Sequence, residues 1–202
     1  MKLYYAAGAC SLAPHIVAQE AGIVLSLERV DLASHKTESG VDFYQLNAKG
    51  SVPFLVLTNG ESLSEGSVIC QYLADSVANT QLLPPVGSMA RYRVQEWQNY
   101  ISSELHKSFS PLFNPKASAE TKALFAQQLK AKLTWVSAQL ANRPYLTGEH
   151  FTIADAYLFV VANWSQFVAL DVSDLAPLHA FLQRVASRPA VQAALKAEGL
   201  IK

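Results

Sequence analysis

The sequence predicts an α/β domain followed by an all-helical domain, and three observations support this fold class. Up to about residue 80, short strand-like runs alternate with helical runs. A turn-rich stretch follows, in which the adjacent prolines Pro84 and Pro85 cannot continue a helix. Beyond this stretch, every periodic segment is helical. We therefore expect domains at residues 1–80 and 87–202, with the boundary between them.

The first domain begins with a predicted strand, helix and strand. Residues 2–5 and 25–30 have the composition of short strands, and residues 11–21 have helical periodicity. Two strands joined by a helix pair in parallel through a right-handed crossover. We expect the first half of this domain to be a βαβ unit.

A ββα unit is expected next. After a polar stretch at residues 35–40 and a short helix at 41–46, two strand-like runs flank Asn59-Gly60, which predicts a tight hairpin with both turn residues at positive φ. Residues 65–74 then return to helical periodicity.

The second domain is predicted to contain long helices and a short last helix. The long helices span residues 88–113, 119–141, 152–168 and 175–186, and the last helix follows Pro189. Thr152 and Asp155 have capping-box spacing at the start of an apolar helix, which indicates a role in folding stability.

Composition excludes several classes of partner. The 202 residues are 50% hydrophobic, and 16 basic residues balance 16 acidic ones. No overall field would attract nucleic acid or an anionic membrane, so we expect a small or neutral partner. No export signal or long apolar run is visible, which predicts a soluble cytoplasmic protein.

The chain has two cysteines, Cys10 and Cys70, too few for a disulfide framework and without metal-ligand spacing. We expect a reducing compartment and no metal. Cys70 lies in a helical run and is interpreted as structural. Cys10 lies where the first strand gives way to a helix, and the helix N-terminus favours a reactive thiolate. A small helix-start residue without chemistry is the alternative for Cys10.

Other candidates lie at turns. Ser11 is either a donor to a thiolate or a helix cap. Val52-Pro53 precedes a strand, and a cis bond there would leave the Val52 backbone free to face a ligand. Glu65 and Gly66 begin a helix, where a carboxylate and free amides suit an ammonium and a carboxylate, although an ordinary capping turn fits as well.

A polar row is predicted on the first helix of the second domain. Asn99, Ser103 and His106 are four and three residues apart, which places them on one stripe of an α-helix. Trp97, Ile101 and Leu105 form the neighbouring apolar stripe, which looks like core. The polar row suits a ligand or a solvated face.

Taken together, these motifs closely resemble those of bacterial β-class glutathione transferases, within the cytosolic glutathione transferase superfamily. They occur in the same order and spacing over the whole chain. The motifs are Cys10-Ser11, Val52-Pro53, Glu65-Gly66, Asn99, Ser103-Glu104-Leu105-His106 and Thr152-Ile153-Ala154-Asp155. The resemblance implies a thioredoxin-like glutathione-binding domain, a helical domain that supplies the electrophile pocket, and a homodimer.

The resemblance also implies residue roles. Cys10 faces the glutathione sulfur, the Val52 backbone pairs with the cysteinyl part, and Glu65-Gly66 holds the γ-glutamyl end. The helical domain adds Asn99, Ser103, Glu104, Leu105 and His106, with Trp164 in the apolar pocket. His35 stands where the family commonly has lysine, and its contact with a glutathione carboxylate would be weaker and pH-dependent.

We therefore expect a transferase with glutathione as co-substrate and no tightly bound cofactor. Its thiolate, stabilised by Cys10, Ser11 and His106, attacks small electrophiles. Alternatives are thiol transfer or disulfide reduction through Cys10, and a noncatalytic carrier of apolar molecules. The sequence identifies neither the physiological electrophile nor the dimer interface.

Overall fold

The computed structural model describes residues 1–202 and divides them into two compact units. The N-terminal unit comprises Met1–Leu83 together with Arg188–Lys202, and the helical unit comprises Pro84–Ser187. The last helix was expected in the second domain, but the structure places it in the N-terminal unit. The reason is long-range pairing, because Arg188 binds Glu20 and Glu198 binds His15.

The N-terminal unit is built on a five-stranded sheet in the order β3-β2-β1-β4-β5. Its strands are β1 Lys2–Tyr5, β2 Ser26–Asp31, β3 Lys36–Thr37, β4 Phe54–Val56 and β5 Ser62–Ser64. β1 pairs in parallel with β2, and the pairs β1–β4, β4–β5 and β2–β3 are antiparallel. The βαβ-ββα order is confirmed, with β3 as an addition that the polar composition of its stretch did not predict.

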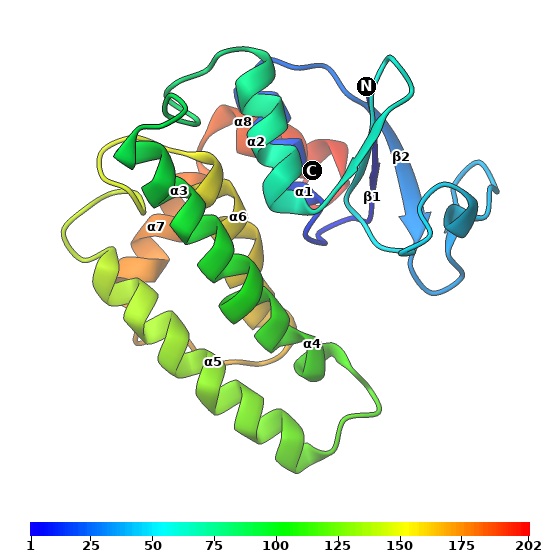
Figure 1. The fold of residues 1–202 in the computed structure, drawn as a ribbon. Helices are drawn as coiled ribbons and strands as arrows, with labels where there is room; N and C mark the ends of the chain where they lie inside the picture. Colours follow the sequence, from blue (N-terminus) through cyan, green and yellow to red (C-terminus); the bar gives the residue numbers. More distant parts are fainter. The chain divides into compact units, whose positions relative to one another are not determined.

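Helices α1 (Leu12–Glu20), α2 (Gly66–Ser76) and α8 (Pro189–Ala197) lie together on one side of this sheet (Figure 1). Side chains alternate along a strand, so the fully buried Leu3 and Leu55 face these helices. Tyr4 and Phe54 face the opposite side, where they pack with Phe43 of the short 3-10 helix η1 (Phe43–Gln45). The loops that follow β1 and precede β4 are thereby held by the helices on one side of the sheet and by the Phe43 cluster on the other.

The β4–β5 hairpin differs from the predicted turn. Gly60 has φ 88°, whereas Asn59 is not among the residues with positive φ. Gly60 N–H donates to Leu57 C=O at 3.1 Å, and Leu57 N–H donates to Glu61 C=O at 2.8 Å. A three-residue turn with glycine in the left-handed position has this pattern, so only one turn residue needs positive φ.

The helical unit contains no strand. Its α-helices are α3 Met89–Tyr100, α4 Lys107–Phe113, α5 Ala119–Gln139, α6 Ile153–Asn163 and α7 Ala176–Ala186. A π-helix, η2 (Ile101–His106), joins α3 to α4, and a 3-10 helix, η3 (Trp164–Phe167), follows α6. None of the helices combines the length and apolar character that crossing a bilayer requires.

Helix α6 is the centre of the helical unit. Every residue from Ile153 to Ala162 is buried, as expected for a helix surrounded by others. The predicted capping box is confirmed at its start: Asp155 accepts from the Thr152 N–H and hydroxyl, each at 2.8 Å. Asp155 also accepts from Leu146 N–H at 2.8 Å, so one carboxylate ties the preceding loop to the helix.

Candidate functional site

Cys10 occupies the loop between β1 and α1, immediately before the position that caps the helix. Its side chain is half-buried, and its thiol donates to the Val52 carbonyl oxygen at 3.2 Å. The loop is itself ordered by the hydrogen bonds Ala9 N–H to Ala6 C=O and Leu12 N–H to Ala9 C=O, both 3.0 Å. The thiol is therefore held beside the segment that precedes β4.

The Val52-Pro53 peptide bond is cis, the arrangement considered from sequence. The Val52 side chain is buried in the core cluster, which leaves its backbone groups to interact elsewhere. Its carbonyl accepts from Cys10, while its N–H donates to no group of the chain. This backbone therefore offers an unused donor next to a cysteine thiol.

Ser11 does not have the predicted role. Its side chain is fully buried, accepts from Ala6 N–H at 3.1 Å and donates to Ala6 C=O at 3.2 Å. It makes no capping hydrogen bond to α1. Because both functions of the hydroxyl are occupied by Ala6, Ser11 closes the loop that carries Cys10 and has no donor left for a thiolate.

Glu65 and Gly66 lie at the start of α2. Glu65 adopts φ 71°, a conformation that L residues rarely take and that concentrates at binding sites. Its carboxylate pairs with Lys49 Nζ at 2.9 Å, and both side chains are exposed. The N–H groups of Gly66 and Ser67 precede the first hydrogen bonds of the helix and are available to an anion.

His35 lies in the turn between β2 and β3, also at positive φ. Its ring packs on Tyr44 with centroids 4.5 Å apart. Its Nδ1 atom is buried and has no hydrogen-bond partner. A buried nitrogen without a partner is costly, so this atom is a weak point of the turn.

In the helical unit, the predicted polar row begins on α3 and runs into η2. Asn99 and Ser103 are exposed, and the Ser103 hydroxyl donates to Asn99 C=O at 3.0 Å. The carboxylate of Glu104 is bound 2.9 Å from Lys132 Nζ. Its carbonyl accepts from Ser108 Oγ at 2.6 Å and from Lys132 at 3.1 Å, which stabilises the irregular backbone.

His106 does not lie in a simple row with Asn99 and Ser103. A π-helix has wider turns than an α-helix, so the α-helical spacing used for the prediction does not hold beyond Tyr100. His106 Nδ1 lies 2.8 Å from the Tyr157 hydroxyl, and its ring contacts Trp164 with centroids 4.8 Å apart. The histidine therefore belongs to an aromatic group that also includes Phe109 and Phe113.

Three further residues have structural positions. Leu105 is fully buried, like Ile101, so its side chain belongs to the core and cannot reach a ligand. Cys70 is also fully buried, and burial raises the pKa of its thiol, in agreement with its predicted structural role. Burial likewise raises the pKa of Tyr5, which keeps this strand residue neutral.

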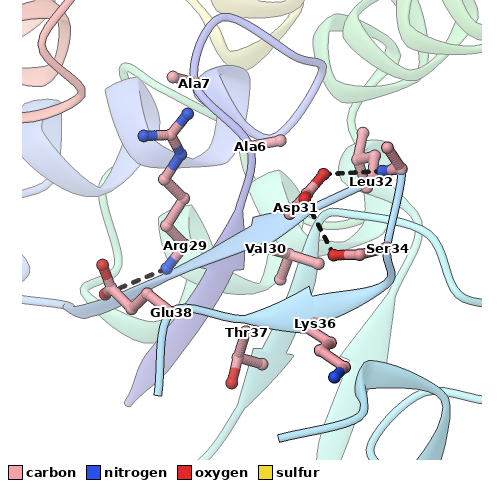
Figure 2. A pocket seen from close by; sticks show the side chains of 11 residues that line it. Ala6, Ala7, Arg29, Val30, Asp31, Leu32, Ser34, Lys36, Thr37 and Glu38 are labelled. Carbon is pink, nitrogen blue, oxygen red and sulfur yellow. Dashed lines mark hydrogen bonds between the residues drawn. The ribbon is translucent and has the colours of Figure 1, made fainter. Parts of the chain in front are cut away.

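A separate hollow of about 520 Å³ opens beside β2 and β3 (Figure 2). Ala6 and Ala7 form one wall, and Arg29, Asp31 and Lys36 lie along the strands. The Asp31 carboxylate is occupied by Ala33 N–H and the Ser34 hydroxyl, whose hydrogen bonds lower the pKa of Asp31. Cys10, Val52 and Glu65 do not line this hollow, so it is distinct from the predicted site. No cluster of metal-ligating side chains is present.

Sequence reasoning missed several residues that support the site. Tyr157, the partner of His106, carries no motif of its own, although the four-residue spacing of Phe109 and Phe113 could have indicated an aromatic group. Lys49 and Lys132 are surface cations without a distinctive pattern. Their roles depend on tertiary contacts alone.

Two domain families match the sequence. The glutathione S-transferase N-terminal domain matches residues 7–76, and the glutathione S-transferase C-terminal domain matches residues 117–193. The two matches fall on the sheet-containing part and the helical part of the chain respectively.

Relatives and solved structures cover nearly the whole chain. The glutathione S-transferase GstA of Escherichia coli is 50% identical over 200 residues, which are 99% of this chain and 100% of that protein. The ternary complex of BphK, a bacterial GST, has a TM-score of 0.96 at 54% identity and covers 98% of this chain and 100% of its own. A sphingomonad glutathione S-transferase complexed with glutathione has a TM-score of 0.95 at 44% identity, with 100% of both chains covered.

Proposed function

Because the chain belongs to the glutathione S-transferase family, we propose that it catalyses attack of the glutathione thiolate on electrophilic, largely apolar small molecules. Glutathione is the co-substrate. The observation that carries the proposal is the pairing of the Cys10 thiol with the Val52 carbonyl, 3.2 Å apart, beside the unused Val52 N–H. An extended thiol peptide can pair with that backbone and bring its sulfur next to Cys10.

The N-terminal unit binds glutathione in this proposal. The Val52 N–H and C=O pair with the cysteinyl residue, and the free amides of Gly66 and Ser67 receive the γ-glutamyl carboxylate. Glu65 binds the ammonium group by exchanging its exposed partner Lys49, a pair that is worth little in water. The partly exposed ring of His35 meets a second carboxylate.

The helical unit contributes side chains in this proposal. Asn99, Ser103 and Glu104 supply polar contacts to glutathione, and His106 donates to the sulfur as the thiolate forms. The aromatic group around Trp164 supports an apolar electrophile, since Phe113 combines an exposed ring with contacts to Trp164 and Phe109. Ser11 is left out of the chemistry because Ala6 occupies its hydroxyl.

Calorimetric titration with glutathione, followed by a conjugation assay with a generic aromatic electrophile, tests the proposal. Wild-type protein and the Cys10→Ala variant are compared. Binding with turnover is expected for the wild type, and a large loss of turnover in Cys10→Ala would give the thiol a direct role. Binding without turnover of any electrophile would identify a carrier instead, and no binding would overturn the proposal.

Thiol transfer is a second candidate, favoured by the partial exposure of Cys10 and by its position where the glutathione sulfur is proposed. The Cys10 thiolate would attack a glutathionyl disulfide, form a Cys10–glutathione disulfide and release the other thiolate. A second glutathione thiolate would then regenerate Cys10 and form oxidised glutathione. Loss of disulfide exchange in Cys10→Ser, with conjugation retained, would establish this activity.

The biological setting proposed here is a cytoplasmic homodimer that detoxifies electrophiles. Light scattering after size-exclusion chromatography measures the assembly, and a mass of about 22 kDa in place of twice that value would contradict a dimer. Cell fractionation tests the location. Sensitivity of a deletion strain to electrophiles tests the detoxifying role.

A further inference from the structure

The C-terminal segment contains a buried carboxylate that the proposed chemistry does not use. Glu198 follows α8, and its side chain is fully buried. Its Oε1 atom lies 2.9 Å from His15 Nδ1, and its Oε2 atom accepts from Gly8 N–H at 3.0 Å. One carboxylate therefore holds both ends of the segment 8–15, which contains Cys10.

The position of Glu198 is costly by itself. A carboxylate loses its hydration on burial, and a negative charge at the C-terminal end of a helix opposes the helix dipole. The hydrogen bonds from Gly8 and His15 compensate for these costs. Removal of either contact would leave this buried carboxylate with one hydrogen bond fewer to compensate for its lost hydration, so both contacts favour the observed position of the segment.

Gly8 is a sensitive point in this segment. It adopts φ 71°, and the side chain of Leu200 lies 3.5 Å from the place where a Cβ atom would stand. Gly8 is two residues before Cys10. Ser11, the residue after Cys10, fixes the other side of the loop through its hydrogen bonds with Ala6. The thiol is thus held between the C-terminal segment and the end of β1.

The other end of α8 provides an internal comparison. Arg188 binds the Glu20 carboxylate through Nε at 2.5 Å and Nη2 at 2.8 Å, which fastens the start of α8 to the end of α1. This pair holds the same two helices together as Glu198 and His15 do. Glu20 is the last residue of α1, so this pair lies at the end of the helix away from Cys10.

We propose that Glu198, with His15, is a positioning residue that sets the place of the Cys10 loop through Gly8. The proposal rests on the function proposed above, because it links the contacts of Glu198 with Gly8 and His15, here called the Glu198 clamp, to glutathione binding and turnover. A C-terminal residue 190 positions from Gly8 would then control the geometry of the thiol site.

Three substitutions separate positioning from charge and from simple stability. Glu198→Asp keeps the charge but is one methylene shorter, so it cannot span Gly8 and His15. Glu198→Gln keeps the length, and His15 can accept its amide N–H by changing tautomer while Gly8 donates to its oxygen. Arg188→Gln loosens α8 at the end away from Cys10 and serves as the matched control.

The readouts are the exchange rate of the Gly8 amide by NMR, the glutathione Kd by calorimetry, kcat and KM for glutathione, and Tm. In Glu198→Asp we expect faster Gly8 exchange and a loss of about tenfold in kcat/KM, since one charged hydrogen bond is lost. Glu198→Gln should lose less than Glu198→Asp. Arg188→Gln should lower Tm with Gly8 exchange and KM within about twofold of the wild type.

Two results would overturn the proposal. The first is unchanged Gly8 exchange in Glu198→Asp. The second is the same ratio between loss of kcat/KM and loss of Tm in Glu198→Asp and in Arg188→Gln, because the loss of activity would then reflect stability alone. If the wild type binds no glutathione, the proposed function fails instead. The positioning role of Glu198 is then tested without glutathione, by comparing Gly8 exchange and the rate of Cys10 alkylation with iodoacetamide in Glu198→Asp and wild type.

Discussion

The N-terminal unit offers a ligand mainly backbone groups, whereas the helical unit offers side chains. Around Cys10, the available groups are the Val52 N–H and the first amides of α2, and buried side chains such as Ser11 and Glu198 hold the loops. On α3 and η2, the groups are the side chains of Asn99, Ser103 and His106. A site made of backbone groups should tolerate a change of its own side chains but should be sensitive to the buried residues that hold its loops. A site made of side chains should lose affinity or activity when one of those side chains is removed.

The largest effect is expected at a support of the helical unit. Asp155→Ala removes three hydrogen bonds and leaves the buried N–H groups of Leu146 and Thr152 unpaired. At about 1–3 kcal/mol for each unsatisfied group, the free energy of unfolding should fall by about 4 kcal/mol. Urea unfolding measures the loss. Thr152→Val, which removes only the hydroxyl, is the control, and an equal loss in both variants would refute the shared role of the carboxylate.

The same carboxyl should make stability depend on pH. Burial raises the pKa of Asp155 from 3.8 to about 6, against the opposing hydrogen bonds from Leu146 and Thr152. Between about pH 4 and pH 6 the folded state binds a proton that the unfolded state has released, so the stability from this group is complete below pH 4 and is lost as pH rises through 6. The difference between wild type and Asp155→Asn should change by about 3 kcal/mol.

This difference is measured by urea unfolding of both proteins from pH 4 to pH 7.5. The amide of asparagine does not titrate, so subtraction removes the contributions of every other group. A difference that is constant over this range, or that rises with pH, would show that the three hydrogen bonds outweigh burial and keep Asp155 ionised.

A smaller effect is expected in the side-chain site. Tyr157→Phe removes the hydroxyl that lies 2.8 Å from His106 Nδ1. Loss of one hydrogen bond, about 1 kcal/mol, should lower kcat for conjugation by roughly fivefold to tenfold. The measurement is repeated in a His106→Ala background, where Tyr157→Phe should have no further effect. Additive losses would mean that Tyr157 acts without His106.

The parts of the molecule that could be predicted from sequence are those set by neighbouring residues. The capping box of Thr152 and Asp155 and the βαβ-ββα order depend on spacings of a few residues, and both are confirmed. The contact between Glu198 and Gly8 spans 190 residues, so no local pattern could reveal it. The π-helix η2 could not be predicted for another reason. Lys132 and Ser108 stabilise it by donating to the carbonyl oxygen of Glu104, and α-helical periodicity does not reveal these contacts.

The smallest effect should come from a side-chain change in the backbone site. A Cβ atom on Gly66 would meet Pro53 Cγ at 3.5 Å, an ordinary contact, and Gly66 does not have positive φ. Gly66→Ala keeps the N–H that is proposed to bind the γ-glutamyl carboxylate, so the Kd for glutathione should change by less than about twofold. Calorimetry measures it, with Asn99→Ala as the matched change in the helical unit, where a threefold to tenfold weakening is expected. If Gly66→Ala weakens binding as much as Asn99→Ala does, the start of α2 recognises glutathione by shape, and the distinction between a backbone site and a side-chain site fails.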